Sequence, residues 1–233
     1  MPVKKSDLGI SKNSFNIIFG PSGSGKSTLL NILSGLQKPT EGSVLYEGQD
    51  IYNWPADTLA YFRARKIGFV YQTSYWVKSL SVLENVSLPL FFLGYSRSQA
   101  VVHARNALSR VGMLGYSGKL PVLLSVGEQQ RVAMARALVN NPEFIFADEP
   151  TGNLDSKNGD MTIKLLESVR AAGRHTIVLV THNMEYLPLA DHLIHIQDGL
   201  IETMRHASAR ETTDKIAAEM QLRINELQKL KGG

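Results

Sequence analysis

The chain has 233 residues, of which 43% are hydrophobic and 20% are charged. This length and composition fit one large globular domain, or a core with a small inserted lobe. The sequence contains no cysteine, which excludes a disulfide framework, thiolate catalysis and a cysteine metal site. The formal net charge of +4 is only mildly basic, and no long Lys/Arg run indicates a nucleic-acid partner.

Signals for export or membrane insertion do not stand out in the sequence. The first five residues, Met-Pro-Val-Lys-Lys, lack the apolar region of a signal peptide. The longest apolar run, residues 88–93, contains Pro89 and falls far short of the roughly 18 apolar residues of a membrane span. We therefore expect a cytoplasmic chain without its own membrane anchor.

The first strong motif follows a short N-terminal segment in which weak alternation over residues 3–10 suggests an edge strand. Residues 15–19 predict a buried strand, and residues 29–33 predict the first turns of a helix that ends near Gly35. Between them lies a stretch that fits G-x-x-x-x-G-K-[ST], the pattern of a phosphate-binding loop. Its residues are Gly20, Pro21, Ser22, Gly23, Ser24, Gly25, Lys26, Ser27 and Thr28.

The chemistry of this phosphate loop follows from its residue types. The glycines let successive backbone N–H groups face an anion, and the helix start adds unpaired donors and the positive end of its dipole. Lys26 reaches the outer phosphates, and the Ser27 hydroxyl binds Mg²⁺. A chance glycine-rich turn is the alternative, and the flanking strand and helix argue against it.

The middle of the chain changes from strands to helices. Residues 43–46 and 67–72 predict strands, and residues 57–65 predict a short basic helix between them. From residue 74 to residue 124 the pattern is helical. Ser96 and Ser125 each begin a capping box, a Ser/Thr whose partner Glu or Gln follows three residues later. The second opens a helix over residues 129–140, which Pro142 ends.

The last third returns to strands. Residues 144–147 and 176–180 predict buried strands on either side of a helix over residues 159–172. Residues 193–201 predict a hairpin through Asp198-Gly199. The tail carries apolar residues on one helical stripe from Ile216 to Leu230, which packs on its own domain or binds a partner. Strands alternating with helices predict a mostly parallel sheet that is covered on both faces.

Polar residues follow three of the predicted strands, at the edge where open α/β sheets bind ligands. After residues 144–147, Asp148 can hold Mg²⁺ through its water shell, and Glu149 can orient an attacking water. Gln72 and His182 end two other strands, where an amide could contact Mg²⁺ and an imidazole could hydrogen-bond a γ-phosphate. Each residue alone also fits an ordinary turn or a structural role.

A second predicted anion site lies at the start of the helix after Leu124. Ser125, Gly127 and Glu128 belong to this helix N-terminus. Since the phosphate loop already supplies the cradle for one nucleotide, a second site suggests that two chains share each nucleotide. An ordinary capped helix is the alternative.

Taken together, these residues resemble the ATP-binding-cassette (ABC) ATPases. The resemblance spans about residues 15–201, and its motifs fall in the family's order at residues 20–28, Gln72, 124–128, 147–150 and 181–182. Residues 83–86, 88–90 and 147–156 look like the subgroup that serves lipoprotein release, macrolide export and cell division.

The resemblance implies an α/β P-loop NTPase core with a mostly parallel sheet, an antiparallel β edge shortened at the N-terminus, and an inserted α-helical subdomain. Residues 1–233 would form one domain, with the core at residues 1–73 and 141–205. The helical subdomain would span about residues 74–140, and a C-terminal amphipathic helix about residues 212–231.

The resemblance also implies a homodimer, or a pair of such ATPases, docked beneath a separate membrane permease at the inner face of the cell membrane. Two ATP molecules would lie head to tail between the cassettes, and no nucleic acid is expected. Lys26 and Ser27 would hold one ATP, Gln72 and Asp148 its Mg²⁺, while Glu149 polarises water and His182 supports the γ-phosphate. Ser125, Gly127 and Glu128 would come from the opposite chain, and residues 153–155 would lie at the dimer seam. Residues 72–85 would lie near the permease, with Tyr75 and Trp76 either docking residues or part of the lobe core.

Two departures from the family pattern stand out. Val126 and Glu128 replace a glycine and a glutamine of the usual Leu-Ser-Gly-Gly-Gln, and Val126 resists positive φ and adds bulk. The aromatic residue that stacks on adenine in the family has no counterpart in the 14 residues before Phe15. We therefore expect retained closure with slower turnover, weakened ATP affinity and poor discrimination between ATP and GTP.

Two rival functions remain. A soluble ABC-type ATPase acting on DNA or ribosomes would carry a long coiled-coil insertion or a second cassette, and the sequence shows neither. A small P-loop kinase or GTPase would not need the Ser125 site or His182. A transport ATPase accounts for all of these motifs.

Overall fold

Six strands form one sheet in the order β4-β5-β6-β1-β7-β8 in the computed structural model, which describes residues 3–4 and 6–205. All neighbouring pairs from β4 to β7 are parallel, and only β7 and β8 are antiparallel. The strands are β1 (Phe15–Phe19), β4 (Ile67–Tyr71), β5 (Phe144–Asp148), β6 (Thr176–Val180), β7 (His192–Gln197) and β8 (Leu200–Arg205). A separate two-stranded sheet pairs β2 (Leu45–Tyr46) with β3 (Gln49–Asp50).

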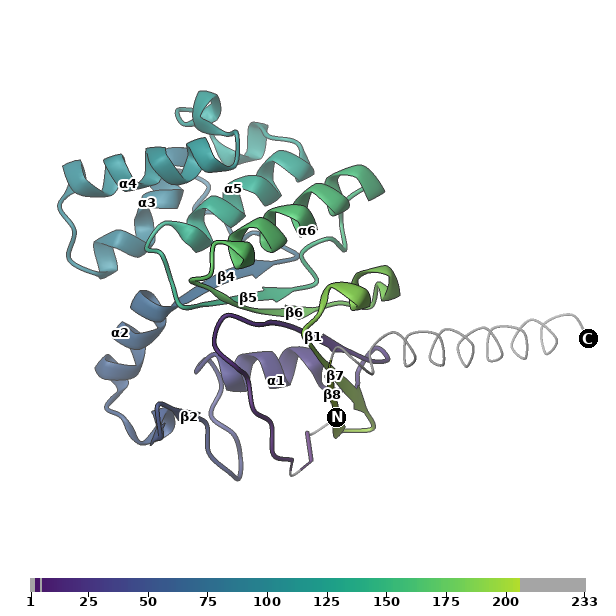
Figure 1. Cartoon of the computed structure of the whole chain (residues 1–233). Helices are drawn as coiled ribbons and strands as arrows, with labels where there is room; N and C mark the ends of the chain where they lie inside the picture. Colours follow the sequence, from purple (N-terminus) through teal and green to yellow (C-terminus); the bar gives the residue numbers. More distant parts are fainter. Residues whose placement is uncertain (1–2, 5, 206–233) are drawn as a thin grey trace, which may run out of the picture.

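Helices cover both faces of the large sheet (Figure 1). The α-helices are α1 (Lys26–Leu33), α2 (Ala56–Lys66), α3 (Val82–Phe92), α4 (Arg97–Arg110), α5 (Val126–Leu138) and α6 (Ser156–Ala171). Short 3-10 helices are η1 (Ile51–Asn53), η2 (Leu114–Tyr116), η3 (Pro121–Leu123) and η4 (Met184–Leu189). Because both faces are covered, the central strands are mostly apolar, and every residue of β1 and β6 is buried, including the polar Asn16 and Thr176.

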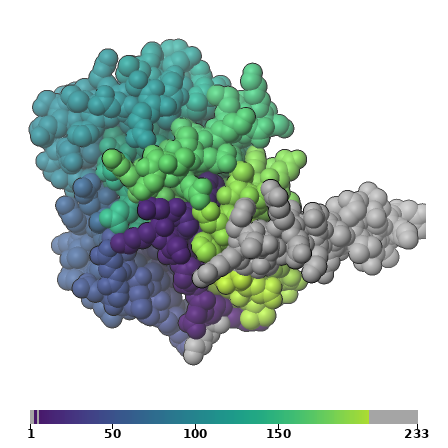
Figure 2. Space-filling model, in the orientation of Figure 1, coloured from purple at the N-terminus to yellow at the C-terminus, as the bar shows by residue number. Residues whose placement is uncertain are grey.

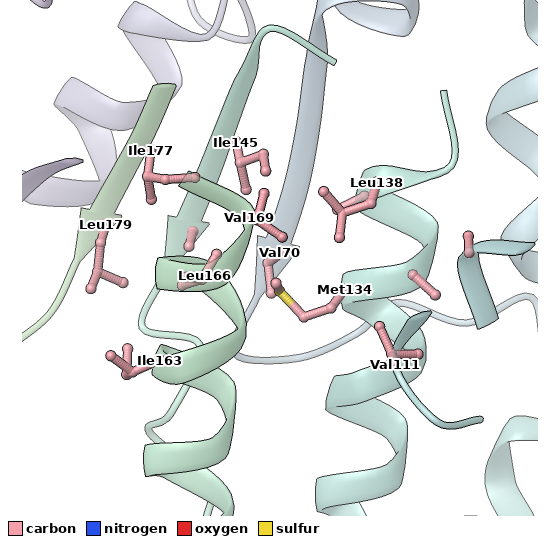
Figure 3. Packing of buried hydrophobic residues seen from close by; sticks show 14 of the residues in the cluster. Val70, Val111, Met134, Leu138, Ile145, Ile163, Leu166, Val169, Ile177 and Leu179 are labelled. Atoms are coloured by element: carbon pink, nitrogen blue, oxygen red, sulfur yellow. The ribbon is translucent and has the colours of Figure 1, made fainter. Parts of the chain in front are cut away.

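The larger hydrophobic core lies between the sheet and helices α5 and α6. Figure 3 shows Val70 and Ile145 of the strands facing Met134 of α5 and Leu166 of α6, all with no exposed surface. Helices α3 and α4 pack beyond α5, and Figure 2 shows this part of the chain gathered at one end of the molecule. The smaller core lies on the opposite face, where Leu30 of α1 and Phe62 of α2 meet Phe146 and Val178.

The strand register brings three parts of the chain to one edge. Tyr71 of β4 lies opposite Asp148 of β5, and Asp148 lies opposite Val180 of β6. The residues that follow these strand ends therefore share the edge at which β1 runs into the phosphate loop. This edge is where the sequence predicted a ligand.

Several predicted elements shift in the structure, and one is wrong. The described residues between 3 and 10 form no strand, although Lys4 donates its backbone N–H to Gly199 O at 2.8 Å. Their apolar side chains, among them Leu8 and Ile10, pack against the α1-side core, so packing and not a strand ladder explains the alternation.

Two helices begin earlier than predicted. Helix α5 starts at Val126 and α6 at Ser156, because Ser125 and Asp155 cap them. The capping boxes at Ser96 and Ser125 and the hairpin of β7 and β8 are confirmed. The predicted tail helix over residues 212–231 lies outside the described residues, and the subdomain boundaries stay predictions. Over residues 3–4 and 6–205, no helix combines the length and apolarity needed to cross a bilayer.

Candidate functional site

The phosphate loop is shaped by glycines where a side chain has no room. A Cβ on Gly20 would lie 2.0 Å from the Ile196 carbonyl oxygen, so the loop passes directly against β7. Gly25 precedes α1 with φ 106°, and no side chain caps the helix start. Its first backbone N–H groups are therefore left for a ligand.

Lys26 is buried at the start of α1 and points back into the loop. Its Nζ donates to Gly20 O at 3.0 Å and to Pro21 O at 2.8 Å, with only 8% of the residue exposed. Two carbonyl oxygens satisfy the ammonium only in part, since it has three donors and a full charge. This arrangement suits an ammonium that exchanges carbonyl partners for phosphate oxygens.

Ser27 and Asp148 meet across the sheet edge. Ser27 Oγ donates to Asp148 Oδ1 at 3.2 Å, and together they present two hard oxygen donors of the kind that Mg²⁺ prefers. Burial raises the pKa of the Asp148 carboxyl, while the Ser27 hydroxyl and the Lys26 charge partly offset this rise. The donor set fits Mg²⁺ in its chemistry.

Glu149 and His182 form the closest contact between predicted catalytic groups. Glu149 Oε2 lies 2.7 Å from His182 Nδ1, and the Glu149 side chain is 20% exposed against 72% for His182. An ionised carboxylate can only accept, so the imidazole donates through Nδ1. Glu149 also has φ 48°, a strained value for a non-glycine residue, and its N–H donates to Val180 O at 3.0 Å.

Gln72 lies at the same edge, but its side chain is engaged elsewhere. Its Nε2 donates to Asn153 Oδ1 at 3.2 Å, and Asn153 Nδ2 donates to Gln72 O at 3.4 Å. The structure thus brings together the strand ends that carry Gln72, Glu149 and His182. For Gln72 to contact a metal, its amide would have to leave Asn153.

The Ser125 helix start stands apart from this edge. Ser125 Oγ and N–H donate to Glu128 Oε2 at 2.9 and 2.8 Å, and Glu128 N–H donates to Ser125 Oγ at 3.3 Å. Hydrogen bonds from Ser125 and Tyr116 hold the pKa of the Glu128 carboxyl below its usual range. Among the described residues, no hydrogen bond joins residues 125–128 to the phosphate loop.

Val126 causes no backbone strain at this helix start. Its φ is negative, since it is not among the positive-φ residues, and 53% of the residue is exposed. The resistance of valine to positive φ therefore has no consequence here, because position 126 is the first residue of α5 and takes helical angles. Only its bulk distinguishes Val126 from the family's glycine.

Sequence reasoning missed residues that pack around the Ser125 helix start. A Cβ on Gly127 would lie 2.5 Å from Asn158 Oδ1, so α5 and α6 meet closely at their first turns. Nearby, Trp76 contacts both Gln129 and Arg136. Nothing in the residue pattern pairs Gly127 with Asn158, or Trp76 with α5, because the partners lie tens of residues apart in sequence.

A groove of about 1230 Å³ lies beside Thr28 at the end of the phosphate loop. The N-terminal segment contributes Leu8 and Ile10 to its wall, and the chain after α1 contributes Pro39 and Thr40. No aromatic residue occurs among residues 1–14. A base that extended past Thr28 would therefore meet no aromatic ring from this segment. The aromatic side chains that line the groove belong to other elements, namely Tyr46, Phe62, Phe144 and Phe146.

A phosphate loop, a Mg²⁺-compatible pair and a carboxylate–imidazole pair at one edge of a parallel sheet define a P-loop NTPase. Residues 3–152 match the model of the family described as "ABC transporter", and the chain belongs to that family. It is an ABC ATPase cassette, as the motifs predicted.

Two relatives fall in the subgroup that the sequence indicated. The chain is 42% identical over 211 residues to a macrolide export ATP-binding/permease protein of Agrobacterium fabrum, covering 91% of this chain and 32% of that protein. It is 39% identical over 202 residues to a lipoprotein-releasing system ATP-binding protein of Shewanella frigidimarina, covering 87% and 84%. The chain thus spans about a third of the length of the first relative.

A solved cassette shows the same fold. The ABC transporter cassette MJ0796, solved as a dimer, is 40% identical in sequence to this chain and superimposes with a TM-score of 0.80. The match covers 88% of this chain and 90% of the cassette. A second dimeric structure of that cassette is a post-hydrolysis state bound to ADP and Pi. The predicted fold class, nucleotide binding and ATPase activity are confirmed at the level of the family.

Proposed function

We propose that the chain is the ATP-hydrolysing subunit of an ABC transporter, which pairs on binding ATP and drives a separate membrane permease. The observation that carries this proposal is the Glu149–His182 pair at 2.7 Å. It lies at the same sheet edge as the Ser27–Asp148 pair and the buried Lys26. A carboxylate beside an imidazole at a phosphate site is suited to orienting water for attack on a phosphorus atom.

Each residue of this edge has a distinct proposed role. Lys26 exchanges the Gly20 and Pro21 carbonyls for outer phosphate oxygens. Ser27 and Asp148, with the Gln72 amide, hold Mg²⁺, which would supply charge neutralisation at the phosphates. Glu149 accepts a proton from the attacking water, and the exposed His182 ring exchanges its contact with Glu149 for the γ-phosphate.

The second half of each proposed site comes from the paired chain. Ser125 and Gly127 lie at a helix start that, within the described part of the chain, makes no hydrogen bond to its own phosphate loop, and Gly127 has no room for a side chain. Ser125 is exposed, and Gly127 is buried against the first turn of α6. A helix start placed in this way suits a role at the seam between two cassettes. The dimeric structures of the similar cassette MJ0796 support this pairing.

A membrane permease is the proposed second partner, which would hold the chain at the inner face of the cell membrane. Tyr75 is the stronger docking candidate, because 71% of it is exposed and its backbone has φ 46°. Trp76 packs against the larger core, which favours the lobe-core role for this residue. The named functions of the two relatives, macrolide export and lipoprotein release, support a transport role.

The decisive experiment measures hydrolysis and pairing together. Phosphate release from Mg-ATP by the full chain is compared with that by Glu149→Gln. We expect the variant to lose about 100-fold or more in rate, as for other catalytic groups, and to accumulate as an ATP-bound dimer in light scattering. Glu202→Gln, at an exposed position outside the groove, is the control. A Glu149→Gln chain that stays monomeric in saturating Mg-ATP would contradict the sandwich.

The permease contact is tested by co-purification from membranes. Tyr75→Ala is expected to reduce the amount of an integral-membrane protein that accompanies the tagged chain. Tyr61→Ala removes another exposed tyrosine, 58% exposed on α2, and should leave recovery unchanged. Equal recovery with both variants would remove Tyr75 from the docking surface.

A further inference from the structure

Helix α5 holds the segment that follows β4 through side chains from three of its positions. Gln130 Nε2 donates to Tyr71 O at 3.3 Å. Trp76 Nε1 donates to Gln129 Oε1 at 2.8 Å. Arg136 donates to Ser74 O at 2.5 Å and to Tyr75 O at 3.3 Å. The segment 71–76, which contains Gln72, is therefore fastened to the helix that Ser125 begins.

Trp76 is the centre of this attachment. The Arg136 guanidinium carbon lies 4.6 Å from the centroid of the Trp76 ring, which is within cation–π distance. No carboxylate among the described residues pairs with Arg136. The Arg136 guanidinium instead contacts the face of the indole and two backbone carbonyl oxygens. Burial lowers the pKa of this guanidinium. We name Trp76, Gln129 and Arg136 the α5 clamp.

The α5 clamp continues to the residue before Ser125. Gln129 accepts from Trp76 with its Oε1 and donates with its Nε2 to Leu124 O at 3.1 Å. An amide with both ends bonded has its orientation fixed. The position of the indole therefore sets Gln129, and Gln129 sets the backbone that leads into the capping box of Ser125.

We propose that Trp76 is a positioning residue that makes the Gln72 segment and the Ser125 helix start move as one body. The inference rests on the proposed function, in which Gln72 serves the chain's own nucleotide and Ser125 serves the nucleotide of the paired chain. The α5 clamp then links the two nucleotides of the dimer through the interior of each chain. A change at one site reaches the other through the indole and not through the seam.

The test is steady-state hydrolysis of Mg-ATP by the full chain with Trp76→Phe. The phenyl ring keeps most of the packing and the contact with Arg136 but removes the indole N–H. We expect kcat to fall about fivefold, the rate equivalent of one hydrogen bond, while KM stays within about twofold. ATP affinity of the monomer should not change, because the phosphate loop is untouched.

Two further variants separate positioning from simple packing. Gln129→Leu removes the acceptor and should lower kcat as much as Trp76→Phe, and the double variant should lose no more than either single variant. Trp54→Phe changes the other tryptophan, whose ring lies 5.3 Å from that of Phe62, and should leave kcat unchanged. The unfolding temperatures of both Trp→Phe variants show whether a fall in kcat comes from a loss of stability.

The outcomes distinguish the α5 clamp from the proposed function. If the wild type hydrolyses ATP at a rate that depends on Lys26, but Trp76→Phe has the same kcat, the proposal for the α5 clamp fails and the proposed function stands. Additive losses in the double variant would also overturn it. If the wild type does not hydrolyse ATP, the proposed function fails first and the inference fails with it.

Discussion

The phosphate-loop edge and the Ser125 helix start, the two proposed anion sites, differ in how their hydrogen-bond donors are satisfied. At the edge, Lys26 is buried and Ser27 already contacts Asp148. The groups of this site are therefore in position before a ligand binds. At the helix start, the hydroxyl and N–H of Ser125 are occupied by the carboxylate of Glu128. The first site is assembled by one chain, whereas the second has its donors satisfied internally until something displaces them.

Because of this difference, the two sites should gain different amounts of free energy when they bind a phosphate. A partly satisfied ammonium and an uncapped helix start gain directly when a phosphate arrives. A capping box is already stable and typically contributes about 1 kcal/mol to its helix. The second site can therefore add little affinity by itself, which agrees with a role that begins only when two chains close.

The largest effect is expected from breaking the assembled site. Lys26→Ala removes the charge that would bind the outer phosphates, and charge-assisted hydrogen bonds contribute about 1.5–3 kcal/mol each. ATP affinity, measured by calorimetric titration, should fall about 100-fold or more. Lys164→Ala, an exposed lysine of α6, is the control. Unchanged affinity in Lys26→Ala would mean that the loop does not hold the phosphates.

The next prediction uses the burial of Asp148. Its pKa is raised above the ordinary value of 3.8, so the charged form destabilises the fold and stability rises as pH falls through the raised pKa. Without nucleotide, Asp148→Asn should unfold at an equal or higher temperature than the wild type at neutral pH. It should also lose the Mg²⁺ dependence of ATP binding.

Nucleotide binding measured over a range of pH tests the direction of the Asp148 pKa shift. Wild-type Mg²⁺-dependent binding should decline as pH falls, and it should begin to do so above the range of an ordinary aspartate. Asp57→Asn, at an exposed position outside the groove, should keep the wild-type profile. A marked loss of thermal stability in Asp148→Asn would show that the carboxylate stabilises the apo fold and would contradict the assigned direction.

A smaller effect is expected in the groove where the base of the nucleotide would lie. Because the N-terminal segment offers Leu8 and Ile10 but no aromatic ring, affinities for ATP and GTP should agree within about threefold. Base stacking contributes roughly 1–3 kcal/mol at nucleic-acid sites, so Leu8→Tyr should tighten both nucleotides about fivefold or more. Inorganic tripolyphosphate is the control and should not respond. A strong preference of the wild type for ATP would contradict this prediction.

The smallest effect is expected at the Ser125 helix start. Val126→Gly removes exposed bulk near the proposed seam without relieving backbone strain, because Val126 already has helical angles. Turnover of Mg-ATP should rise by about twofold or less, in part because glycine costs helix stability. An unchanged rate would show that the valine does not impede closure.

Much of the site was predictable from local patterns. The spacing of residues 20–28 and the apolar runs before Gln72, Asp148 and Thr181 are local properties of the chain. Parallel strands place their carboxyl ends together, so the common edge followed without coordinates. The capping box at Ser125 was equally local, since its partners are three residues apart.

Other features needed the folded chain. The apolar alternation over residues 3–10 looked like a strand, because packing against a core and pairing in a sheet leave the same pattern in so short a segment. The turn of the Gln72 amide toward Asn153 and the contact between Gly127 and Asn158 depend on how two distant loops meet. No spacing rule relates such positions.

From residue 15 onward, the sequence alone predicted the order of the main strands and helices, the phosphate loop and the polar groups that follow the strands, because hydrophobic period, glycine content and capping act within a few residues. Only the tertiary structure decided the left-handed backbone of Glu149, the burial of Asp148 and the α5 clamp. These arise where segments dozens of residues apart compete for the same space, and that competition is settled by packing over the whole molecule.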